Sequence, residues 1–353
     1  MKRLIMKNYF SRVLMVVTLF LTSIVSAQKR TEDFTISLPT KKVDKSYYKT
    51  IKLIDRRTDT TSLGIVQQGL LNAKARVVSA SSLSSQFQNV LNGINGENTE
   101  DGTLVLYLKQ LYFAELTAKL SEHGYCYFQA FLFSKNDDGT YSLIDQSDKV
   151  IDHRATDVTK ETLQKGSEML IDFISTNAAK KPETTHHYTY EQVKNFDDTA
   201  KESIPFYSSS PLKDGVYKDY NSLKNQQPDQ EISNVKFYGN APKIVRIYET
   251  ADGKEKEIKK EDIYAVVYKG EPYLYLSIEN LFTRAEKRDN DYYFIGKIRS
   301  DPNRGSMMVT GAAFFGAIGV LIMTNPAYPF EMKINYFNGG FIPVKEIQNK
   351  RYE

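Results

Sequence analysis

Few residues of this chain have the types and spacing needed for catalysis, and each has a simpler structural interpretation. His123 and Cys126 lie three positions apart, and a cysteine beside a histidine is the arrangement of an activated thiol nucleophile. In a strand, however, residues three apart point to opposite faces of the sheet. We therefore expect a turn histidine and a core cysteine rather than a catalytic pair.

Charged clusters offer two further candidates. Asp145, Asp148 and Asp152 could provide paired carboxylates for glycoside chemistry or for calcium, but no glycine loop or bidentate glutamate follows at calcium-loop spacing. The run 55–57, Asp-Arg-Arg, could bind an anionic group. For both clusters the simpler interpretation is solvated charge along a strand or at its end.

The remaining motifs predict no catalytic residue, no cofactor and no metal. His186 and His187 are adjacent and lack further ligands for a metal ion. The chain also has neither a glycine loop that cradles phosphate nor the Gly-x-Ser-x-Gly turn of serine hydrolases.

The N-terminus has the three parts of a cleavable secretory signal peptide over 1–27. An apolar stretch over 13–25 follows four basic residues, and small residues precede a cleavage site between Ala27 and Gln28. The basic residues are Lys2, Arg3, Lys7 and Arg12. The alternative is an uncleaved anchor, although the apolar stretch is shorter than the roughly 20 residues that span a bilayer. We expect an exported protein of the periplasm or cell envelope.

Removal of this signal changes the charge of the protein. The full chain has 47 basic and 43 acidic residues, and the signal holds four basic and no acidic ones. The mature chain therefore has no net formal charge, which argues against a nucleic-acid partner. The single cysteine, Cys126, forms no intramolecular disulfide. A hydrophobic core must therefore hold the exported chain together.

The spacing of apolar residues predicts an α+β domain over 31–178, in the order β-α-β-β-β-α, with helices layered on one face of a sheet. Strands are expected over 47–55, 103–113, 124–133 and 141–147, with a turn over 136–139. A helix over 83–94 should begin at Ser81 or Ser82, because a hydroxyl can accept hydrogen bonds from the first turn. A second helix should begin at Asp157 and carry an apolar stripe to Ile174.

This order resembles that of small periplasmic domains found in auxiliary lipoproteins of ABC-type transport systems and in activators of peptidoglycan synthases. The residues that carry the resemblance are 51–57, Ile-Lys-Leu-Ile-Asp-Arg-Arg, followed by Leu63 and Gly64. It implies a periplasmic address. The chain departs from those families because it lacks a cysteine at the first mature position, so the resemblance does not extend to lipid tethering.

A polar stretch over 179–211 is expected to be a linker that buries little apolar area, with one short helix over 190–196. The rest, 212–353, is expected to be a mostly antiparallel β domain. Its predicted hairpins pair 243–250 with 255–260, 264–268 with 273–276, and 332–337 with 341–344.

The second domain is similar to uncharacterised secreted proteins of Bacteroidota. The similarity rests on 214–217, Asp-Gly-Val-Tyr, on 220–225 with Pro228, on 263–265 with Gly270, and on Gly339 with Gly340. It implies an envelope address and no defined chemistry.

One segment of the second domain is unusually apolar. Residues 305–330 contain no charge, and 306–323 form their core. Three interpretations stay open: a transmembrane helix, a glycine-rich helix packed on the domain or lying at a membrane surface, and a buried strand or loop. Strands on both sides of the segment favour the second, because a spanning helix would place them on opposite sides of the bilayer. The expected membrane or helix-packing contacts are Gly311, Ala312, Phe315, Gly316 and Gly319.

Together these features predict an exported, non-enzymatic cell-envelope protein that binds a protein or envelope partner, with membrane contact through 306–323. The alternatives are a hydrolase acting on envelope polymers and a soluble protein that binds carbohydrate or peptide. Close, buried acidic pairs in a cleft would favour the hydrolase. A row of exposed tyrosines such as Tyr273 and Tyr275 would favour the binding protein.

Overall fold

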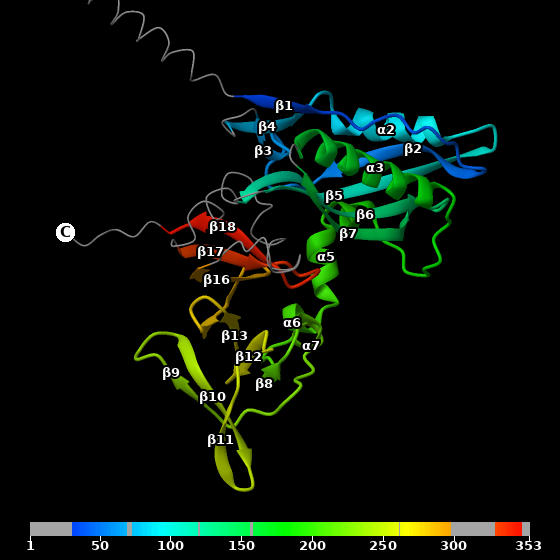
Figure 1. The fold of residues 1–353 in the computed structure, drawn as a ribbon. Helices are drawn as coiled ribbons and strands as arrows, with labels where there is room; N and C mark the ends of the chain where they lie inside the picture. Colours follow the sequence, from blue (N-terminus) through cyan, green and yellow to red (C-terminus); the bar gives the residue numbers. More distant parts are fainter. Residues whose placement is uncertain are drawn as a thin grey trace, which may run out of the picture.

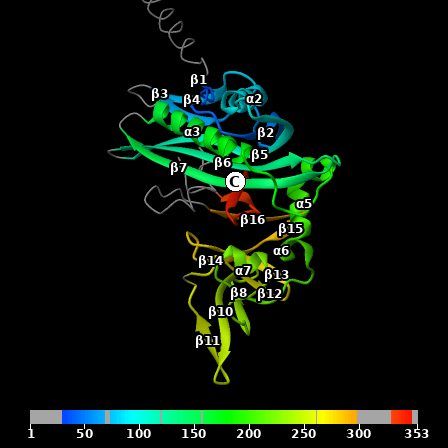
Figure 2. The ribbon, with the colours of Figure 1, turned by 90° about the vertical axis from the view of Figure 1, so that its right-hand side faces the viewer.

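Mixed α and β structure, with β-sheet predominating, makes up the chain in the computed structural model. The model describes residues 30–68, 73–118, 121–155, 158–260, 262–297 and 329–347. Three sheets, here called A, B and C, follow one another along the sequence, and sheet C lies between the other two (Figure 1, Figure 2). Within the described ranges, no helix combines the length and hydropathy needed to cross a membrane.

Sheet A is built around one long central strand, β5. The strands lie in the order β1 (Thr31–Phe34), β4 (Ala73–Ser79), β3 (Gly64–Gln68), β5 (Thr99–Ala118), β6 (Ser121–Lys135) and β7 (Tyr141–Ala155). β2 (Ser46–Asp55) pairs in parallel with the first half of β5, and β3 pairs with a later stretch of the same edge. The predicted strands and the turn over 136–139 are confirmed, although β5, β6 and β7 extend further than expected.

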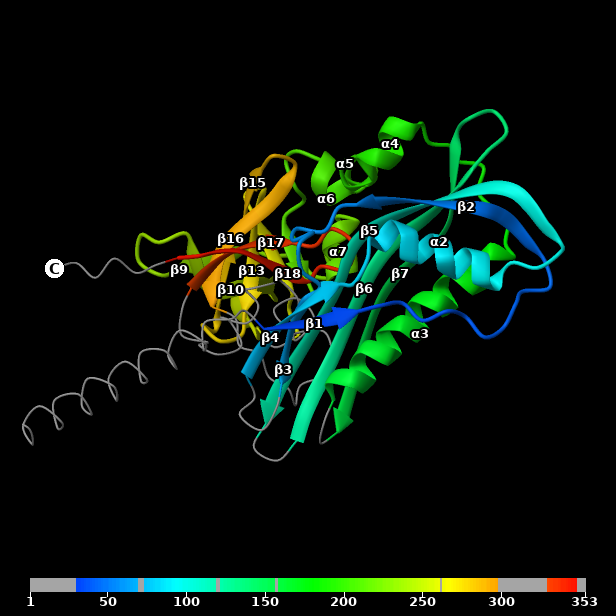
Figure 3. The same ribbon diagram turned by 90° about the horizontal axis from the view of Figure 1, so that it is seen from above.

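Two helices cover one face of sheet A, α2 (Leu83–Ile94) and α3 (Thr159–Ala178) (Figure 1, Figure 3). Their apolar stripes, which include Phe87 and Leu170, pack with Phe113 and Phe128 of the sheet in one core. Of the two expected caps of α2, Ser82 is the one used, since its hydroxyl accepts from the amide of Ser85.

The second predicted helix is present as α3, within two residues of its expected start. Asp157 lies outside the described residues, and the residue that caps α3 is Val158, which makes no side-chain capping bond. Val158 is fully buried, so the helix begins after a buried apolar residue and not after a polar cap.

The stretch over 179–211 buries more apolar side chain than its composition indicates. It contains α4 (Tyr190–Lys194), α5 (Phe196–Glu202) and α6 (Pro205–Ser208). Phe196 packs against Tyr107, Phe131 and Phe133 on the second face of sheet A. Phe206 is fully buried in the core beneath sheet C. Phe196 therefore anchors the connection to sheet A, and Phe206 anchors it to the core of the second half.

Sheets B and C are antiparallel throughout their described pairings. Sheet B has the order β11 (Lys254–Ile258), β10 (Lys243–Ala251), β14 (Leu281–Arg284), β13 (Glu271–Leu276), β12 (Ala265–Tyr268) and β8 (Gly215–Tyr217), with β9 (Asn234–Phe237) beside β10. Sheet C has the order β15 (Glu286–Arg288), β16 (Asp291–Lys297), β17 (Pro329–Ile334) and β18 (Phe341–Glu346). A short helix, α7 (Tyr220–Lys224), follows β8. The three predicted hairpins are confirmed.

The turn between β17 and β18 joins sheet C to sheet A. Phe337 packs edge-on against Phe131, and the Asn338 amide donates to Asp148 at 2.8 Å. Gly339 has φ +76°, and a β-carbon there would lie 2.3 Å from the Tyr220 ring. A side chain at this position would therefore disturb the contact that joins the two halves.

The packing of α3 on sheet A gives a direct test of this layer. A β-carbon at Gly166 would lie 2.5 Å from the Phe113 ring and 2.9 Å from Cys126 Sγ. Gly166→Leu should therefore lower the free energy of unfolding by about 1–3 kcal/mol through overpacking, despite leucine's better helix propensity. Thermal unfolding followed by circular dichroism measures the change.

The control for Gly166→Leu is Gly139→Asn. Gly139 has φ +83° in an open turn, where a β-carbon meets nothing within 4 Å, and asparagine tolerates such a backbone. An unchanged or higher melting temperature for Gly166→Leu would contradict the observed packing of α3.

Candidate functional site

A pocket of about 420 Å³ lies between sheet A and sheet C. The loop after β2 and strand β5 provide one wall, α5 provides a second, and strands β16 to β18 provide the third. Pockets that hold small ligands usually fall between 300 and 1,000 Å³. The pocket therefore has the size of a small-molecule site and is formed by segments far apart in the sequence.

A β-bulge in β5 aims Lys109 at this pocket. Leu108 pairs with Ala130 and Gln110 with Gln129, so Lys109 is an extra residue on β5. The bulge shifts the alternation of the strand, and both Lys109 and Gln110 line the pocket while Leu108 stays in the core. Bulges often re-aim side chains in this way next to functional sites.

The ammonium group of Lys109 is buried, with its side chain 10% exposed. Its Nζ lies 3.0 Å from Asp197 Oδ1 and 4.1 Å from the centre of the Tyr336 ring. The Tyr336 hydroxyl donates to the same carboxylate oxygen at 2.9 Å. An ion pair and an aromatic face together offset part of the cost of removing this charge from water.

A second buried carboxylate holds two further lysines. Asp291 accepts from Lys201 at 2.8 Å and from Lys333 at 3.3 Å. Lys201 is 4% exposed and also lies 3.5 Å from Asp198, on the solvent side of α5. Lysines from α5 and β17 thus meet at one aspartate of β16.

The loop after β2 brings Arg56 to the pocket. The backbone amide of Arg56 donates to Leu108 O at 2.8 Å, next to the bulge. Its guanidinium group donates to the Asn195 side chain at 3.0 Å. Among the described residues, the structure pairs no carboxylate with Arg56, so its charge is available to a ligand.

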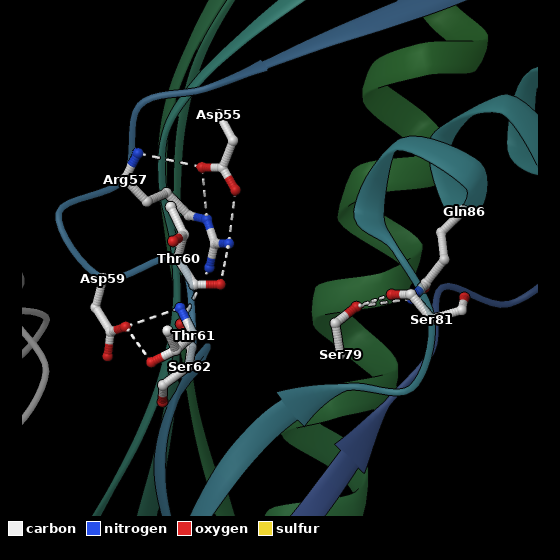
Figure 4. Close-up of polar contacts among 9 residues, drawn as sticks. All are labelled: Asp55, Arg57, Asp59, Thr60, Thr61, Ser62, Ser79, Ser81 and Gln86. Carbon is white, nitrogen blue, oxygen red and sulfur yellow. Dashed lines mark hydrogen bonds and ion pairs between the residues drawn. The ribbon is translucent and has the colours of Figure 1, made fainter.

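The neighbouring residues give this loop a fixed shape (Figure 4). Arg57 binds Asp55 through two nitrogens, at 2.9 and 2.7 Å, and donates to Ser62 O at 3.0 Å. Asp59 accepts from the amide and hydroxyl of Thr61. The two arginines of the Asp-Arg-Arg run therefore have different roles. Arg57 stabilises the loop, and Arg56 faces the pocket.

Positive charge predominates in the pocket. Five basic and three acidic residues line it. The basic residues are Arg56, Arg57, Lys109, Lys201 and Lys333, and the acidic ones are Asp59, Asp197 and Asp291. Asp55 pairs with Arg57 and Asp198 lies 3.5 Å from Lys201, just outside this lining, so Arg56 is the lining cation that no carboxylate of the described residues pairs with.

Burial and ion pairing shift the pKa values of the central pair. Burial lowers the pKa of Lys109 more than the attraction of Asp197 raises it. Burial opposes ionisation of Asp197, but the adjacent Lys109 nonetheless brings the pKa of that carboxyl below its usual value. Asp197 is thus held ionised, and Lys109 loses its proton more easily than a lysine in water.

The other sequence candidates do not come together. Cys126 is buried among Phe113 and the α3 side chains, and burial raises the pKa of its thiol far above the usual value. His123 is buried within β6 and not in a turn as expected, on the opposite face of sheet A and 3.6 Å from Asp152. A Cys–His pair is therefore not formed, as the strand spacing predicts.

The three aspartates of β7 have separate partners. Asp145 lies 3.5 Å from Lys180, and Asp152 pairs with His123. Asp148 accepts from Tyr127 at 2.7 Å, from Gln129 at 3.1 Å and from Asn338. The carboxylate of Asp148 thus holds the β17–β18 turn on sheet A. None of these three carboxylates lines the pocket between sheets A and C.

The remaining expected positions are resolved in part. The interpretation of Tyr273 as an exposed residue was wrong, because it is 6% exposed and packs in the core of sheet B. Tyr275 is half-buried and donates to Asn280 at 3.1 Å. His186 and His187 are exposed, and the described residues contain no cluster of three metal-binding side chains. Gly311, Ala312, Phe315, Gly316 and Gly319, like Ala27 and Gln28, lie outside the described residues.

Sequence reasoning missed the lysines of the pocket. One signal was present, since Lys109 and Gln110 interrupt an otherwise apolar strand and break its alternation, as a bulge does. Lys201, Asp291 and Lys333 carry no such local signal, because only the packing of α5 against sheet C brings them together.

Comparisons with known proteins add little to this description. No family model matches the chain, and no curated protein matches it. A crystal structure of a DUF330 protein from Xanthomonas campestris aligns with 48% of this chain and 99% of its own length, at 6% identity and a TM-score of 0.28. A crystal structure of an uncharacterized protein aligns with 42% of this chain and 97% of its own length, at 10% identity and a TM-score of 0.23. TM-scores this low do not indicate a shared fold.

Removal of the Asp197 carboxylate tests the central ion pair. Asp197→Ala leaves Lys109 buried without its partner, which should lower the free energy of unfolding by about 2 kcal/mol, less than for a fully buried pair because Asp197 is 34% exposed. Urea denaturation measures the change.

The neighbouring Asp198→Ala is the matched control, because Asp198 is 64% exposed and its removal should change stability by no more than about 0.5 kcal/mol. The double variant Lys109→Met with Asp197→Ala should recover part of the loss. Equal effects of Asp197→Ala and Asp198→Ala would show that the Lys109–Asp197 ion pair contributes no more to the free energy of unfolding than an exposed aspartate does.

Proposed function

We propose that this chain is an exported, non-enzymatic binding protein of the cell envelope, and that its interdomain pocket takes a small anionic ligand. The observation that carries the proposal is the meeting of Arg56, Lys109 and Lys333 in one pocket. A layered α+β domain over 31–178 and a mostly antiparallel β domain over 212–353 act as the two halves of this site, joined by 179–211.

The case for export rests on the sequence. The tripartite signal pattern over 1–27 supports removal before Gln28. The resemblance of the first domain to periplasmic domains of transport lipoproteins, and of the second to secreted proteins of Bacteroidota, supports the same address. A partner in the envelope, protein or polymer, would then deliver or receive the ligand.

The chemistry of the pocket favours binding over catalysis. Lys109, Lys201 and Lys333 each donate to a carboxylate in a charge-assisted hydrogen bond, so each amine is already engaged in an ion pair. Two carboxylates of the pocket, Asp197 and Asp291, each accept from lysines, and the aspartates of β7 have separate partners outside it. A buried, pre-organised set of cations is the arrangement of an anion receptor.

The proposal includes membrane association in which 306–323 contacts the surface of a bilayer. Lys297, the end of β16, is the register partner of Pro329, the start of β17. The two residues that flank the connection over 298–328 therefore lie side by side at the same end of sheet C. A single crossing of a bilayer would separate these ends, so we propose contact with a membrane surface or with the folded chain rather than a span.

Expression of the full chain in an exporting bacterium tests the address. We expect the protein outside the cytoplasmic fraction, with Gln28 as its first residue by mass spectrometry of the N-terminal peptide. Ala27→Arg should block cleavage and leave a longer chain, because the peptidase requires a small residue there. Thr31→Arg, beyond the cleavage site, serves as the control. Full-length protein retained in the cytoplasm would contradict export.

The pH dependence of anion binding tests the pocket itself. Binding needs protonated Lys109, and burial lowers the pKa of this lysine below 10.5. Affinity for inorganic phosphate should therefore fall as the pH rises through that lowered value, with the anion otherwise unchanged above about pH 8. Isothermal titration calorimetry between pH 7 and 10 measures the fall.

Two variants separate charge from packing. Lys109→Arg should keep its affinity to higher pH, since the guanidinium group does not lose its proton in this range. Lys109→Met should bind at least tenfold more weakly at pH 7, the loss of one charged hydrogen bond. Lys165→Gln, on the exposed side of α3, should bind normally. Phosphate binding that is unaffected by Lys109→Met would rule out this pocket as the site.

A further inference from the structure

We propose that the natural ligand of the pocket is a small carboxylate with an amide group on its α-carbon, as in an N-acylated amino acid or the free carboxyl terminus of a peptide. The carboxylate binds Arg56, and Gln110 binds the amide. This inference rests on the proposed anion-binding function and names the class of ligand. Its basis is a buried glutamine that lines the pocket and has no hydrogen-bond partner within the described ranges.

Gln110 is buried in the wall that sheet A contributes to the pocket. It is 9% exposed and belongs to the lining. No hydrogen bond joins its carboxamide to another residue in the part of the chain that the structure describes. Buried polar side chains nearly always have such partners, and leaving one unpaired costs stability. A carboxamide that faces a pocket without a partner is therefore available to a ligand.

The neighbouring glutamine on β6 provides a contrast. Gln129 is the register partner of Gln110 and is 1% exposed. Its Nε2 donates to Asp148 at 3.1 Å, and its Oε1 accepts from the Asn335 amide at 3.4 Å. Both sides of the Gln129 carboxamide are thus used within the protein, whereas those of Gln110 are not. Burial in this wall does not by itself leave a glutamine unpaired.

Arg56 lies beside Gln110 in the fold. Asp55 is the register partner of Leu108, and the Arg56 amide donates to Leu108 O at 2.8 Å. Because Lys109 is the extra residue of the bulge, Gln110 is the next residue of β5 to pair with β6. Neighbouring strands lie about 4.8 Å apart. Long side chains from these two positions can therefore reach adjacent groups of one small ligand.

The pairing of the lining cations favours a ligand with one negative charge. Four of the five basic residues lie within 3.3 Å of a carboxylate. Arg56 has no such partner in the described structure, and its Nη2 donates to Asn195 Oδ1, which orients the guanidinium group. A guanidinium group binds a carboxylate through two parallel hydrogen bonds. A monocarboxylate therefore matches Arg56 in charge and in shape.

The carboxamide of Gln110 selects the group next to that carboxylate. It offers an acceptor oxygen and an NH2 donor. In an N-acylated amino acid, the amide N–H can donate to this oxygen while a carboxylate oxygen accepts from the NH2 group. A free amino acid presents an ammonium ion instead. The lining carboxylates Asp59, Asp197 and Asp291 already have cationic partners, so an ammonium ion would lack a counter-charge.

Calorimetry of the mature full chain with four small ligands tests this inference. We expect N-acetylalanine to bind at least tenfold more tightly than propionate, which lacks the amide, and than N-acetylalaninamide, which lacks the charge. It should also bind at least tenfold more tightly than alanine. Trialanine separates the two sources of this chemistry. Equal affinity for trialanine and N-acetylalanine would support a peptide terminus, and weaker binding of trialanine would support an N-acylated amino acid.

Variants assign the gain to Gln110. Gln110→Met should remove most of the advantage of N-acetylalanine over propionate. Because it breaks no hydrogen bond within the described structure, the melting temperature of the ligand-free protein should stay the same or rise. Gln129→Met, in contrast, should lower the melting temperature, since two hydrogen bonds are lost. Gln146→Met, at an exposed position of β7 outside the pocket, should leave binding unchanged.

The outcomes separate the two proposals. Equal affinity for N-acetylalanine and propionate would overturn the amide and leave the anion receptor standing. Equal affinity for N-acetylalaninamide or for alanine would overturn the acylated carboxylate. Absence of binding by any carboxylate or phosphate would overturn both proposals. A Gln110→Met variant that melts at a lower temperature and binds N-acetylalanine normally would make Gln110 a structural residue and overturn the proposed site.

Discussion

The cost of holding the Lys109 ammonium group away from water shapes the junction between the two halves of this protein. A buried cation is tolerated only when an opposite charge and further polar contacts surround it. Asp197 of α5 and the Tyr336 ring beyond β17 provide these contacts. Lys109 and the two residues that stabilise it come from three separate parts of the chain, so the site exists only when those parts are packed together.

The same constraint explains why α5 and the β17–β18 turn are firmly packed. Phe196 fixes α5 to sheet A, and Phe337 does the same for the turn. The sequence offered Asp148 as a candidate catalytic carboxylate. In the structure it accepts three hydrogen bonds where the β17–β18 turn contacts sheet A. These hydrogen bonds link strands β6 and β7 of sheet A to the β17–β18 turn of sheet C through one exposed carboxylate.

Individual helices and hairpins could be predicted from the sequence, but the contacts between elements far apart in the chain could not. Helix α2 with its Ser82 cap follows from apolar spacing and a hydroxyl at the right position. The three hairpins of the second half follow from turn residues such as Asp252 and Gly253. β3 and β4 were missed because they are short and gain their stability from pairing with β5 and β1. The start of α3 has no side-chain capping bond from Val158, so a capping pattern in the sequence does not mark it.

The candidate site, likewise, could be predicted from the sequence only in part. Arg56 could be proposed as an anion contact from its place after a strand, and it does line the pocket. Lys109 lies in a strand that looks apolar, and only the bulge turns its side chain outward. Lys201, Asp291 and Lys333 are ordinary surface residues by composition. Their burial follows from a contact between elements more than 80 residues apart in the chain, which no local pattern records.

Crystals of the mature protein soaked with selenate would test the central claim most directly, because the anomalous signal of selenium locates the anion without assumptions about affinity. The account predicts a peak within hydrogen-bond distance of Arg56, Lys109 and Lys333, between sheets A and C. Selenate bound only elsewhere on the surface, with this pocket empty, would contradict it.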